Sequence, residues 1–295
     1  MRVGRYVRNG DRGSFVVRAD GALIDAAYMD SDRVPSQVRE AARGLEGNDS
    51  DFYAALPVIE RYLSENPKRL DDATPLPKYV EFDTPAHPQS FICVGLNYRD
   101  HAGEAKMALP KAPRLFAKTA NAISAHNRQV EIPPNCSQLD FEAELAVVIG
   151  KRCSKVRKED GASYIGGYTC GNDVSARDFQ FGDGQWYRGK SCDGFGPLGP
   201  WIVTPAEVGD PHNLKIQLRL NGATMQDSNT SNLVFDVPEL VEYASTYITL
   251  EPGDVILTGT PFGVGFSRTP PVYLKSGDLM EVEIERIGVL TNRIA

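Results

Sequence analysis

Three carboxylates alternate along the short stretch 139-LDFEAELAVVIG-150, where the chain becomes strongly apolar. Asp140, Glu142 and Glu144 fall at every second residue. If the stretch is a strand, its period of two places these acids on one face and the intervening apolar residues on the other. Like charges this close repel, and a buried unpaired carboxylate is costly. The pattern indicates either an edge strand with a solvated acidic face or a site where a cation offsets the repulsion.

The second interpretation is a divalent metal site. Mg²⁺ and Mn²⁺ prefer oxygen ligands, and few carboxylates suffice because water or substrate fills the other positions. Glu142 and Glu144 point two ligands the same way, and Asp173, just after the strand-like 165-IGGYTCGN-172, can supply a third. We therefore predict one divalent cation per chain, Mg²⁺ or Mn²⁺, since both metals accept the same oxygens.

His101 and Glu104 are spaced i, i+3 within 95-GLNYRDHAGEAK-106. On a short helix they share a face and can form a hydrogen bond. An imidazole oriented by a carboxylate is a general base near neutral pH. The alternative is a histidine that lies beside an acid by chance. Because the segment follows an apolar run and contains Gly103 and Pro110, we expect a surface loop that can close as a lid.

Two further segments offer groups that bind anions. Arg177 and Lys190, with Lys118 as a third candidate, would bind a dianionic substrate if they faced the metal, although solvated surface charge is the usual role of such residues. Gly259 and Thr260 in 257-LTGTP-261 offer a backbone N–H and a hydroxyl to a carboxylate. Alone, that pentapeptide would be only a turn.

The composition limits the classes of protein. The 295 residues are 41% hydrophobic and 24% charged, with a net charge of −7. The acidic balance and the scattered basic residues argue against nucleic-acid binding. No run approaches the roughly 20 apolar residues of a membrane span, and the basic N-terminus lacks the apolar region of a signal peptide. Five widely spaced cysteines indicate reduced thiols, so we expect a cytoplasmic protein without a membrane partner.

The chain divides into a small N-terminal domain with its linker, residues 1–83, and a larger domain, residues 84–295. Asn9-Gly10 predicts a hairpin between strands 2–7 and 13–18. Amphipathic helices are expected over 36–45 and 51–66, the second with Asp51 as its N-cap. The proline-rich, aperiodic segment 71–90 is interpreted as the linker.

The larger domain is predicted to be rich in short strands. A hairpin is expected at 221–222 and a helix over 237–249. Many strands with few helices favour a rolled or barrel-like fold over alternating βαβ units, which makes the fold class α+β with a mostly β main domain. The expected strands are 91–95, 115–118, 141–149, 164–172, 199–203, 215–220, 254–258 and 278–284.

Together these segments resemble the fumarylacetoacetate hydrolase family. The resemblance covers about residue 91 to the C-terminus, and its motifs follow the family's order. Several independent motifs coincide, which makes the match specific, whereas the first eighty or so residues resemble the family's variable N-terminal domain less closely. The matching motifs are GLNYRDH, LDFEAELAVVIGK, GGYTCGNDVSARDFQ, the GK of YRGKSCDGFGPLGPW, and EPGDVILTGTP.

The resemblance implies the fold and the roles of the residues. The larger domain would be the family's mixed β-roll, and the protein a homodimer. Asp140 has no ligand role in the family and would support the site. The metal ligands would be Glu142, Glu144 and Asp173; the catalytic residues His101, Glu104 and Lys190; and the substrate-binding residues Arg177, Gln180, Gly259 and Thr260.

From these roles we predict a metal-dependent hydrolase that cleaves a carbon–carbon bond in 2,4-dioxo acids of the acylpyruvate or fumarylpyruvate type. The substrate would be a small anionic 2-oxo acid, and a pyruvate enolate stabilised by the metal would be the shared intermediate. The same site allows oxaloacetate decarboxylation, or isomerase and tautomerase activity on 2-hydroxymuconate-type dienoates of aromatic catabolism. A non-catalytic metal-binding scaffold is the remaining class.

Overall fold

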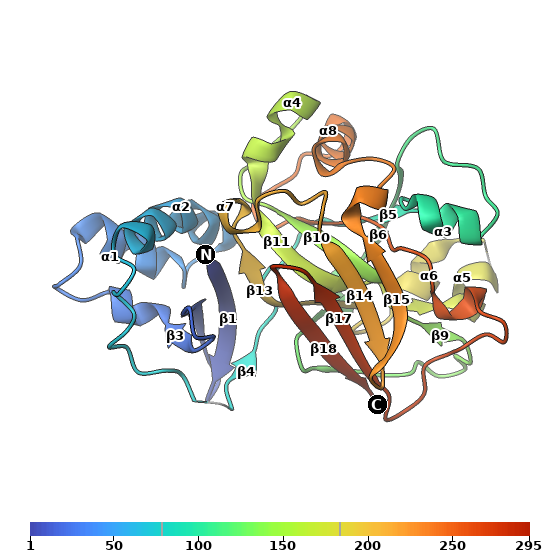
Figure 1. Ribbon diagram of the computed structural model, residues 1–295, viewed down its shortest axis with the longest axis horizontal. Helices are drawn as coiled ribbons and strands as arrows, with labels where there is room; N and C mark the ends of the chain where they lie inside the picture. Colours follow the sequence, from blue (N-terminus) through green and yellow to red (C-terminus); the bar gives the residue numbers. More distant parts are fainter. Residues whose placement is uncertain (78, 183) are drawn as a thin grey trace.

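The computed structural model describes residues 1–77, 79–182 and 184–295. Lys78 of the expected linker and Asp183 of the glycine-rich segment lie outside the described residues. The chain forms a small N-terminal unit beside a larger body made mostly of β-strands (Figure 1). This confirms the predicted α+β class.

The strands and helices have the following bounds. The strands are β1 (Arg2–Arg8), β2 (Asp11–Val17), β3 (Leu23–Asp25), β4 (Glu81–Phe82), β5 (Phe91–Gly95), β6 (Arg114–Lys118), β7 (Ile123–Ala125), β8 (Gln129–Val130), β9 (Leu139–Asp140), β10 (Ala143–Ile149), β11 (Ile165–Asn172), β12 (Ser175–Ala176), β13 (Gly196–Val203), β14 (Lys215–Leu220), β15 (Ala223–Asn229), β16 (Val255–Leu257), β17 (Leu279–Ile284) and β18 (Gly288–Ile294). The α-helices are α1 (Ser36–Gly44), α2 (Asp49–Glu65), α3 (Arg99–Glu104), α4 (Lys158–Gly161), α5 (Arg177–Gly182), α6 (Trp186–Lys190), α7 (Pro205–Val208) and α8 (Val237–Tyr247). Five short 3₁₀ segments complete the described elements: η1 (Ala26–Met29), η2 (Ala120–Ala122), η3 (Ala162–Tyr164), η4 (Thr230–Asn232) and η5 (Gly265–Ser267).

The strands of the described residues form two main sheets. The larger sheet has 11 strands, nine of them in the order β3-β2-β1-β13-β11-β10-β16-β5-β6, and the second has five in the order β15-β14-β17-β18-β8. Strand β1 pairs with β13 of the main body, with Arg2 opposite Val203. The N-terminal unit therefore extends the main sheet, and its strands are continuous with those that carry the site.

Strand β10 is buried on both faces along its whole length, because it lies between two apolar cores. Leu145 and Val147 pack in the core shared with the five-stranded sheet. Ala146 and Val148 pack in the core shared with the N-terminal unit. A strand covered on both sides reads as a continuous apolar run, which explains the sequence after Glu144.

The N-terminal hairpin confirms the prediction from its turn. Asn9 and Gly10 both have positive φ, 54° and 89°, which suits the tight turn between β1 and β2. Helices α1 and α2 were also expected. The N-cap of α2 was assigned wrongly to Asp51: Asn48 caps the helix, and its side chain accepts a hydrogen bond from the Asp51 N–H.

The strand expected over 141–149 begins two residues later than predicted, at Ala143. Asp140 belongs to β9, which pairs with β12, and β10 starts at Ala143. Between them, the Phe141 N–H donates to the Asp140 carboxylate and the Glu142 N–H donates to the side chain of Asn172. Because side chains satisfy these two N–H groups, the backbone departs from the ladder at Phe141 and Glu142, and Glu142 is itself one of the metal ligands that we predicted.

Contacts of Arg5 and Asp49, which form an ion pair within the N-terminal unit, join that unit to the main body. Arg5 donates to Asp49 at 2.6 Å and contacts His87 Nδ1 at 2.7 Å, and its guanidinium lies over the ring of Phe52, 4.3 Å from the centroid. Asp49 also packs against Gly253, where an added Cβ would come within 2.3 Å of the carboxylate. This contact brings the start of α2 against the turn before β16.

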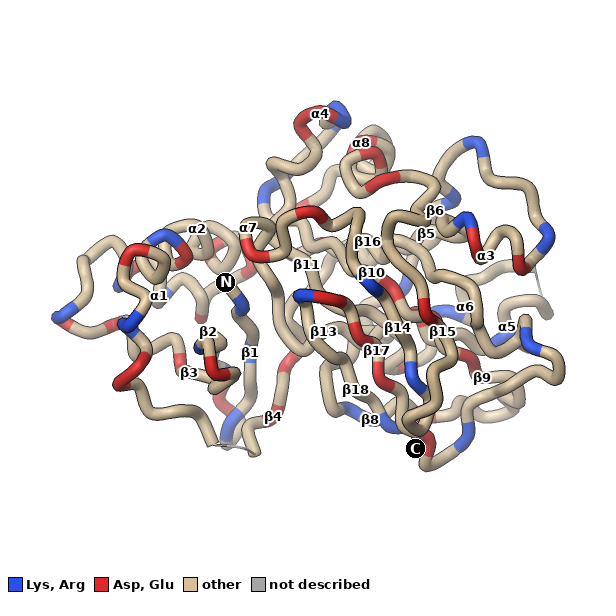
Figure 2. Tube along the Cα trace, in the orientation of Figure 1, with Lys and Arg blue, Asp and Glu red and all other residues tan. Residues whose placement is uncertain are grey.

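In the described residues, no helix is long and apolar enough to cross a membrane. Figure 2 shows acidic and basic residues interspersed along the trace.

Replacing Arg5 with methionine should destabilise the protein by about 2 kcal/mol. The side chains of Arg5 and Asp49 are only 9% and 17% exposed, so the change leaves a largely buried carboxylate unpaired. Breaking a fully buried pair costs roughly 3–5 kcal/mol, and the partial exposure of this pair lowers that cost. Denaturant unfolding measures the change. The matched control is Arg39→Met, whose partner Asp32 is fully exposed; it should leave the midpoint unchanged. Equal shifts for both variants would contradict the prediction.

Candidate active site

Three carboxylates converge where β10 and β11 meet. Glu144 lies in β10 opposite Gly171 of β11, and Asp173 directly follows β11, its N–H donating to the Glu142 carbonyl at 2.9 Å. Each of the three acids, Glu142, Glu144 and Asp173, offers an oxygen within 4.8 Å of the others, and all three are buried. Antiparallel pairing thus places the third acid beside the first two.

Buried cations surround this acidic triad. Lys190, at the end of α6, donates to Glu142 at 2.8 Å and to Asp173 at 2.6 Å. Arg177, at the start of α5, donates to Glu142 at 2.6 Å. Lys118, at the end of β6, lies 2.7 Å from the other oxygen of Asp173. Hydrogen bonds between ionised partners are short and strong, so these contacts fix two of the three acids.

Glu144 differs from the other two acids of the triad. Its carboxylate accepts the Gly259 N–H at 2.6 Å and has no ion pair with a described side chain. Burial, followed by the charges of Asp173 and Glu142, raises its pKa well above the ordinary value. Burial also opposes ionisation of Glu142, but Lys190 and Arg177 outweigh it and lower that pKa.

The charges in this cluster do not balance. Four buried carboxylates, those of the triad and Asp140, face the buried cations Lys118, Arg177 and Lys190. One negative charge is left over when all are ionised. A divalent cation would convert this excess into a net charge of +1, which would attract an anionic substrate despite the acidic surface.

Asp140 lies behind the triad. Its carboxylate accepts from Arg177 Nε at 2.9 Å and from the N–H groups of Gly265 and Phe266. Arg177 in turn donates to Gln180 at 2.9 Å. Asp140 therefore orients Arg177 and anchors the loop after β16. It supports the acidic triad and does not belong to it.

Gly259 and Thr260 lie close to the acids, and their donors have partners within the protein. Besides the bond from Gly259 to Glu144, the Thr260 hydroxyl donates to the Ala143 carbonyl at 2.9 Å and accepts from Gln226 at 2.9 Å. Their proposed contact with a substrate carboxylate remains a prediction, and it would require groups other than these bonded donors.

His101 and Glu104 form the expected pair on α3, with His101 Nδ1 3.2 Å from Glu104 Oε2. Glu104 also accepts the Gly263 N–H at 3.1 Å. Burial opposes ionisation of Glu104, but these two hydrogen bonds outweigh it and lower its pKa. A carboxylate that stays ionised favours the tautomer with the proton on Nδ1, which leaves Nε2 as the basic nitrogen.

A cavity of about 340 Å³ joins these groups. His101, the acidic triad, Arg177, Gln180, Lys190 and Thr260 line it, whereas Glu104 and Gly259 lie behind the lining residues. Trp186 and Met107 also line the cavity, whereas the nearby aromatic residues Tyr187 and Phe262 are not among the residues of its wall. Tyr187 instead has 63% of its surface exposed.

The donor set fits a hard divalent cation. It offers three buried carboxylates, one without a cationic partner, and no sulfur or imidazole ligand, which favours Mg²⁺ or Mn²⁺ over zinc. The excess negative charge of the cluster is the independent sign that a cation belongs here.

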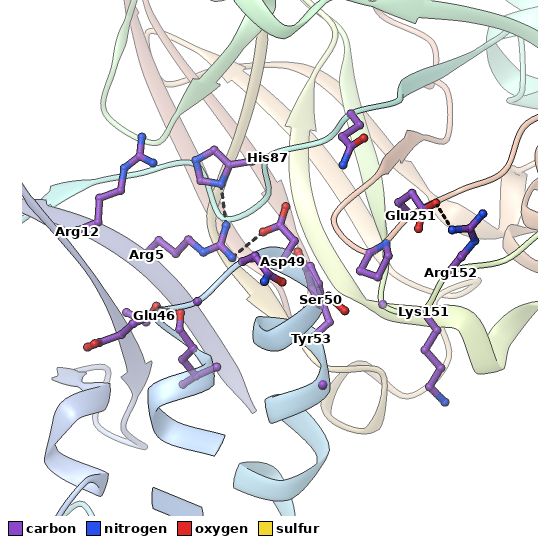
Figure 3. Close-up of a pocket in the computed structure, with 18 of the residues that line it drawn as sticks. Arg5, Arg12, Glu46, Asp49, Ser50, Tyr53, His87, Lys151, Arg152 and Glu251 are labelled. Atoms are coloured by element: carbon purple, nitrogen blue, oxygen red, sulfur yellow. Dashed lines mark hydrogen bonds and ion pairs between the residues drawn. The ribbon is translucent and has the colours of Figure 1, made fainter. Parts of the chain in front are cut away.

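A larger cavity, of about 1040 Å³, lies between the N-terminal unit and the main body (Figure 3). Its arginines are largely neutralised by neighbouring acids: Arg5 pairs with Asp49, and Arg152 pairs with Glu251 at 3.2 Å. The acidic triad does not line this cavity. Chemistry rather than size therefore selects the smaller cavity as the candidate active site.

Sequence reasoning underestimated one residue and missed two. Lys118 was only a candidate cation, yet it is buried against Asp173. Arg114, four residues before Lys118 on the same strand, lines the cavity and was not singled out. Gln226 was missed altogether; it bonds Ala143 and Thr260 from β15. The period of β6 was the available signal for Arg114, whereas nothing local marked Gln226.

Comparison with known proteins identifies the family. The family model described as fumarylacetoacetate (FAA) hydrolase C-terminal matches residues 90–295. The chain therefore belongs to the fumarylacetoacetate hydrolase family, as its motifs predicted.

Relatives and solved structures cover most of the chain. Oxaloacetate tautomerase FAHD2A, mitochondrial, of Bos taurus is 46% identical over 248 residues, 82% of this chain and 76% of its own. Among solved structures, a fumarylacetoacetate hydrolase from Exiguobacterium antarcticum has a TM-score of 0.81 at 35% identity, covering 100% of this chain and 99% of its own. The 5-carboxymethyl-2-hydroxymuconate delta-isomerase of Mycobacterium smegmatis has a TM-score of 0.76 at 34% identity, with the same coverage.

Replacing either Glu142 or Glu144 with glutamine should abolish metal binding. The two single changes should shift the melting temperature of the metal-free protein in opposite directions. Glu144→Gln removes the excess charge and should raise the melting temperature in EDTA. Glu142→Gln leaves Arg177 and Lys190 short of a partner and should lower it. Mg²⁺ or Mn²⁺ should stabilise only the wild type, by about 2.7 kcal/mol at a hundredfold excess over Kd.

Thermal unfolding of the three proteins, with EDTA and then with each metal, provides the measurement. A stabilisation by metal that survives in both variants would place the cation elsewhere. A lower melting temperature for Glu144→Gln in EDTA would contradict the charge argument.

Proposed function

We propose that this chain is a metal-dependent tautomerase of small 2-oxo diacids, with the keto–enol interconversion of oxaloacetate as its reaction. The observation that carries the proposal is the position of His101, which lines the same cavity as the acidic triad while Glu104 holds its Nδ1. The name of the Bos taurus relative supports this choice. It replaces acylpyruvate hydrolysis, our first prediction, as the favoured activity.

His101 is the proton carrier in this reaction. In the keto-to-enol direction, its Nε2 removes a proton from C3 while the C2 oxygen gains one from solvent, and the imidazolium then releases its proton to solvent. In the reverse direction the imidazolium, protonated from solvent, gives a proton to C3 while the enol oxygen releases its own to solvent. Glu104 holds the ring and stabilises the imidazolium that forms. No bond between carbon atoms breaks, so the reaction needs only one positioned base.

Lys190 and Arg177 act as fixed positive charges. Burial favours neutral Lys190, but Asp173 and Glu142 outweigh it and raise its pKa above the ordinary value. An ammonium with a raised pKa is a poor proton donor, so Lys190 orients the triad and stabilises negative charge on the substrate. Gln180, held by Arg177, presents its amide at the cavity wall.

Glu142, Glu144 and Asp173 would hold the divalent cation, which when bound supplies a Lewis acid for the charge that develops on the 2-oxo group. The apolar wall formed by Trp186 and Phe116, whose ring centroids are 5.1 Å apart, limits water beside the reacting carbons. Exclusion of water strengthens the charge interactions in the cavity.

Carbon–carbon bond hydrolysis is the second candidate, because the similar structure from Exiguobacterium antarcticum is named a fumarylacetoacetate hydrolase. The same His101–Glu104 pair would then activate water. Oxaloacetate decarboxylation and the isomerisation of dienoates use the same site. The homodimer implied by the resemblance belongs to this proposal, and light scattering tests it.

The deciding experiment follows three substrates with Mg²⁺, with Mn²⁺ and with EDTA. The ultraviolet absorbance of enol-oxaloacetate reports tautomerisation, and pyruvate release reports decarboxylation of oxaloacetate or hydrolysis of acetylpyruvate. We expect metal-dependent loss of the enol with little pyruvate from either acid. Rapid pyruvate release from acetylpyruvate without tautomerisation would instead establish the hydrolase.

Replacing His101 with asparagine should lower the tautomerase kcat about 100-fold or more, the usual contribution of a general base. Glu104→Gln should have a smaller effect, because the ring remains but loses its orientation. Both variants should retain the stabilisation by metal, since neither residue belongs to the triad. Full activity of the asparagine variant would remove His101 from the reaction.

A further inference from the structure

One face of β6 runs from the acidic triad to the edge of the cavity. Because side chains alternate along a strand, Lys118, Phe116 and Arg114 share this face. Lys118 is buried against Asp173, and Phe116 and Arg114 line the cavity. The ammonium of Lys190 lies 5.2 Å from the centre of the Phe116 ring, so Phe116 separates the cationic cluster from Arg114.

Arg114 is an unusual cation among the described residues of the cavity wall. Its backbone is fixed by pairing with Gly95 of β5, and its side chain is exposed. No described residue forms an ion pair or hydrogen bond with its guanidinium, whereas Arg177 and Lys190 each bind two carboxylates. Its charge is therefore available to a ligand.

The spacing of Arg114 and Lys118 along β6 limits the length of a ligand that could lie between them. At a rise of about 3.3 Å per residue, the Cα atoms of Arg114 and Lys118 are roughly 13 Å apart, which the two long side chains shorten by reaching toward each other. Apolar side chains, those of Phe116 and Trp186, line the intervening wall. The cavity thus has a cationic and acidic cluster at one end, an apolar middle and a free arginine at the other end.

We propose that Arg114 binds the distal carboxylate of a linear diacid whose 2-oxo acid end lies at the acidic triad. Arg114 would then be the residue that selects dianionic over monoanionic 2-oxo acids. The inference rests on the proposed function for the location of the 2-oxo acid end. It goes further by naming the residue that binds the other end of the substrate. The planar guanidinium of arginine can donate two parallel hydrogen bonds, which suits a carboxylate.

The test uses two acids of equal carbon number that differ only in the distal carboxylate: 2-oxoglutarate and 2-oxopentanoate. Titration calorimetry measures their affinities for the protein with Mg²⁺, without any need for turnover. The wild type should bind 2-oxoglutarate at least tenfold more tightly. Arg114→Gln should remove this preference by weakening only 2-oxoglutarate, and Arg114→Lys should restore part of it. Lys111→Gln, a nearby exposed change outside the cavity wall, should keep the preference.

Steady-state kinetics of Arg114→Gln provide a second test. With oxaloacetate, Arg114→Gln should raise KM about tenfold and change kcat little, because the residue binds the end of the substrate that does not react. A preference that survives in Arg114→Gln, or its absence from the wild type, would overturn the assignment. If the preference depends on Arg114 but no tautomerisation occurs, the arginine assignment stands and the proposed reaction fails.

Discussion

The structure depends on one electrostatic constraint: four carboxylates and three cations are buried together near the start of β10 and the ends of β11 and β6. Removing each of these ions from water costs several kcal/mol, and only close pairing offsets that cost. Lys190 satisfies this requirement for Glu142 and Asp173 at once, with bonds of 2.8 and 2.6 Å. Glu144 is the exception, and its isolation explains why the cluster suits a divalent cation.

The strands serve this cluster by bringing distant parts of the chain to one point. Antiparallel pairing of β10 with β11 places Asp173 beside Glu142, and the departure from the ladder before Ala143 turns Asp140 toward Arg177. The loop after β16 supports the His101–Glu104 pair, because the Gly263 N–H donates to Glu104. The acidic triad, its cations and His101 therefore lie around one small cavity, although their elements are separated along the sequence.

The N-terminal unit contributes to the frame and not to the lining of the acidic cavity. Its strand β1 pairs with β13, which pairs with β11, the strand that leads to Asp173. The contact of Asp49 with Gly253 secures it a second time, beside the turn before β16. A shared sheet makes the unit part of one structure, although the family model begins only at residue 90.

The sequence by itself determined what local patterns encode. Asn9-Gly10 predicted a hairpin because few residues tolerate positive φ, and the apolar run after Glu144 predicted a core strand. The i, i+3 spacing predicted the bond between His101 and Glu104, since a helix brings those positions together. Local patterns also proposed the three acids and the cations separately, and the family motifs joined them into one site.

Only the tertiary structure decided which groups are paired and which are free. Strand β18 was missed because Asn292 interrupts its apolar pattern; the residue is buried, and the backbone carbonyls of Ala125 and Arg128 satisfy its amide. Lys118 and Arg114 lie four residues apart on one strand, yet one is buried against Asp173 and the other is exposed at the cavity wall. Long-range pairing and burial set these roles, because the energy of a charge depends on its neighbours in space.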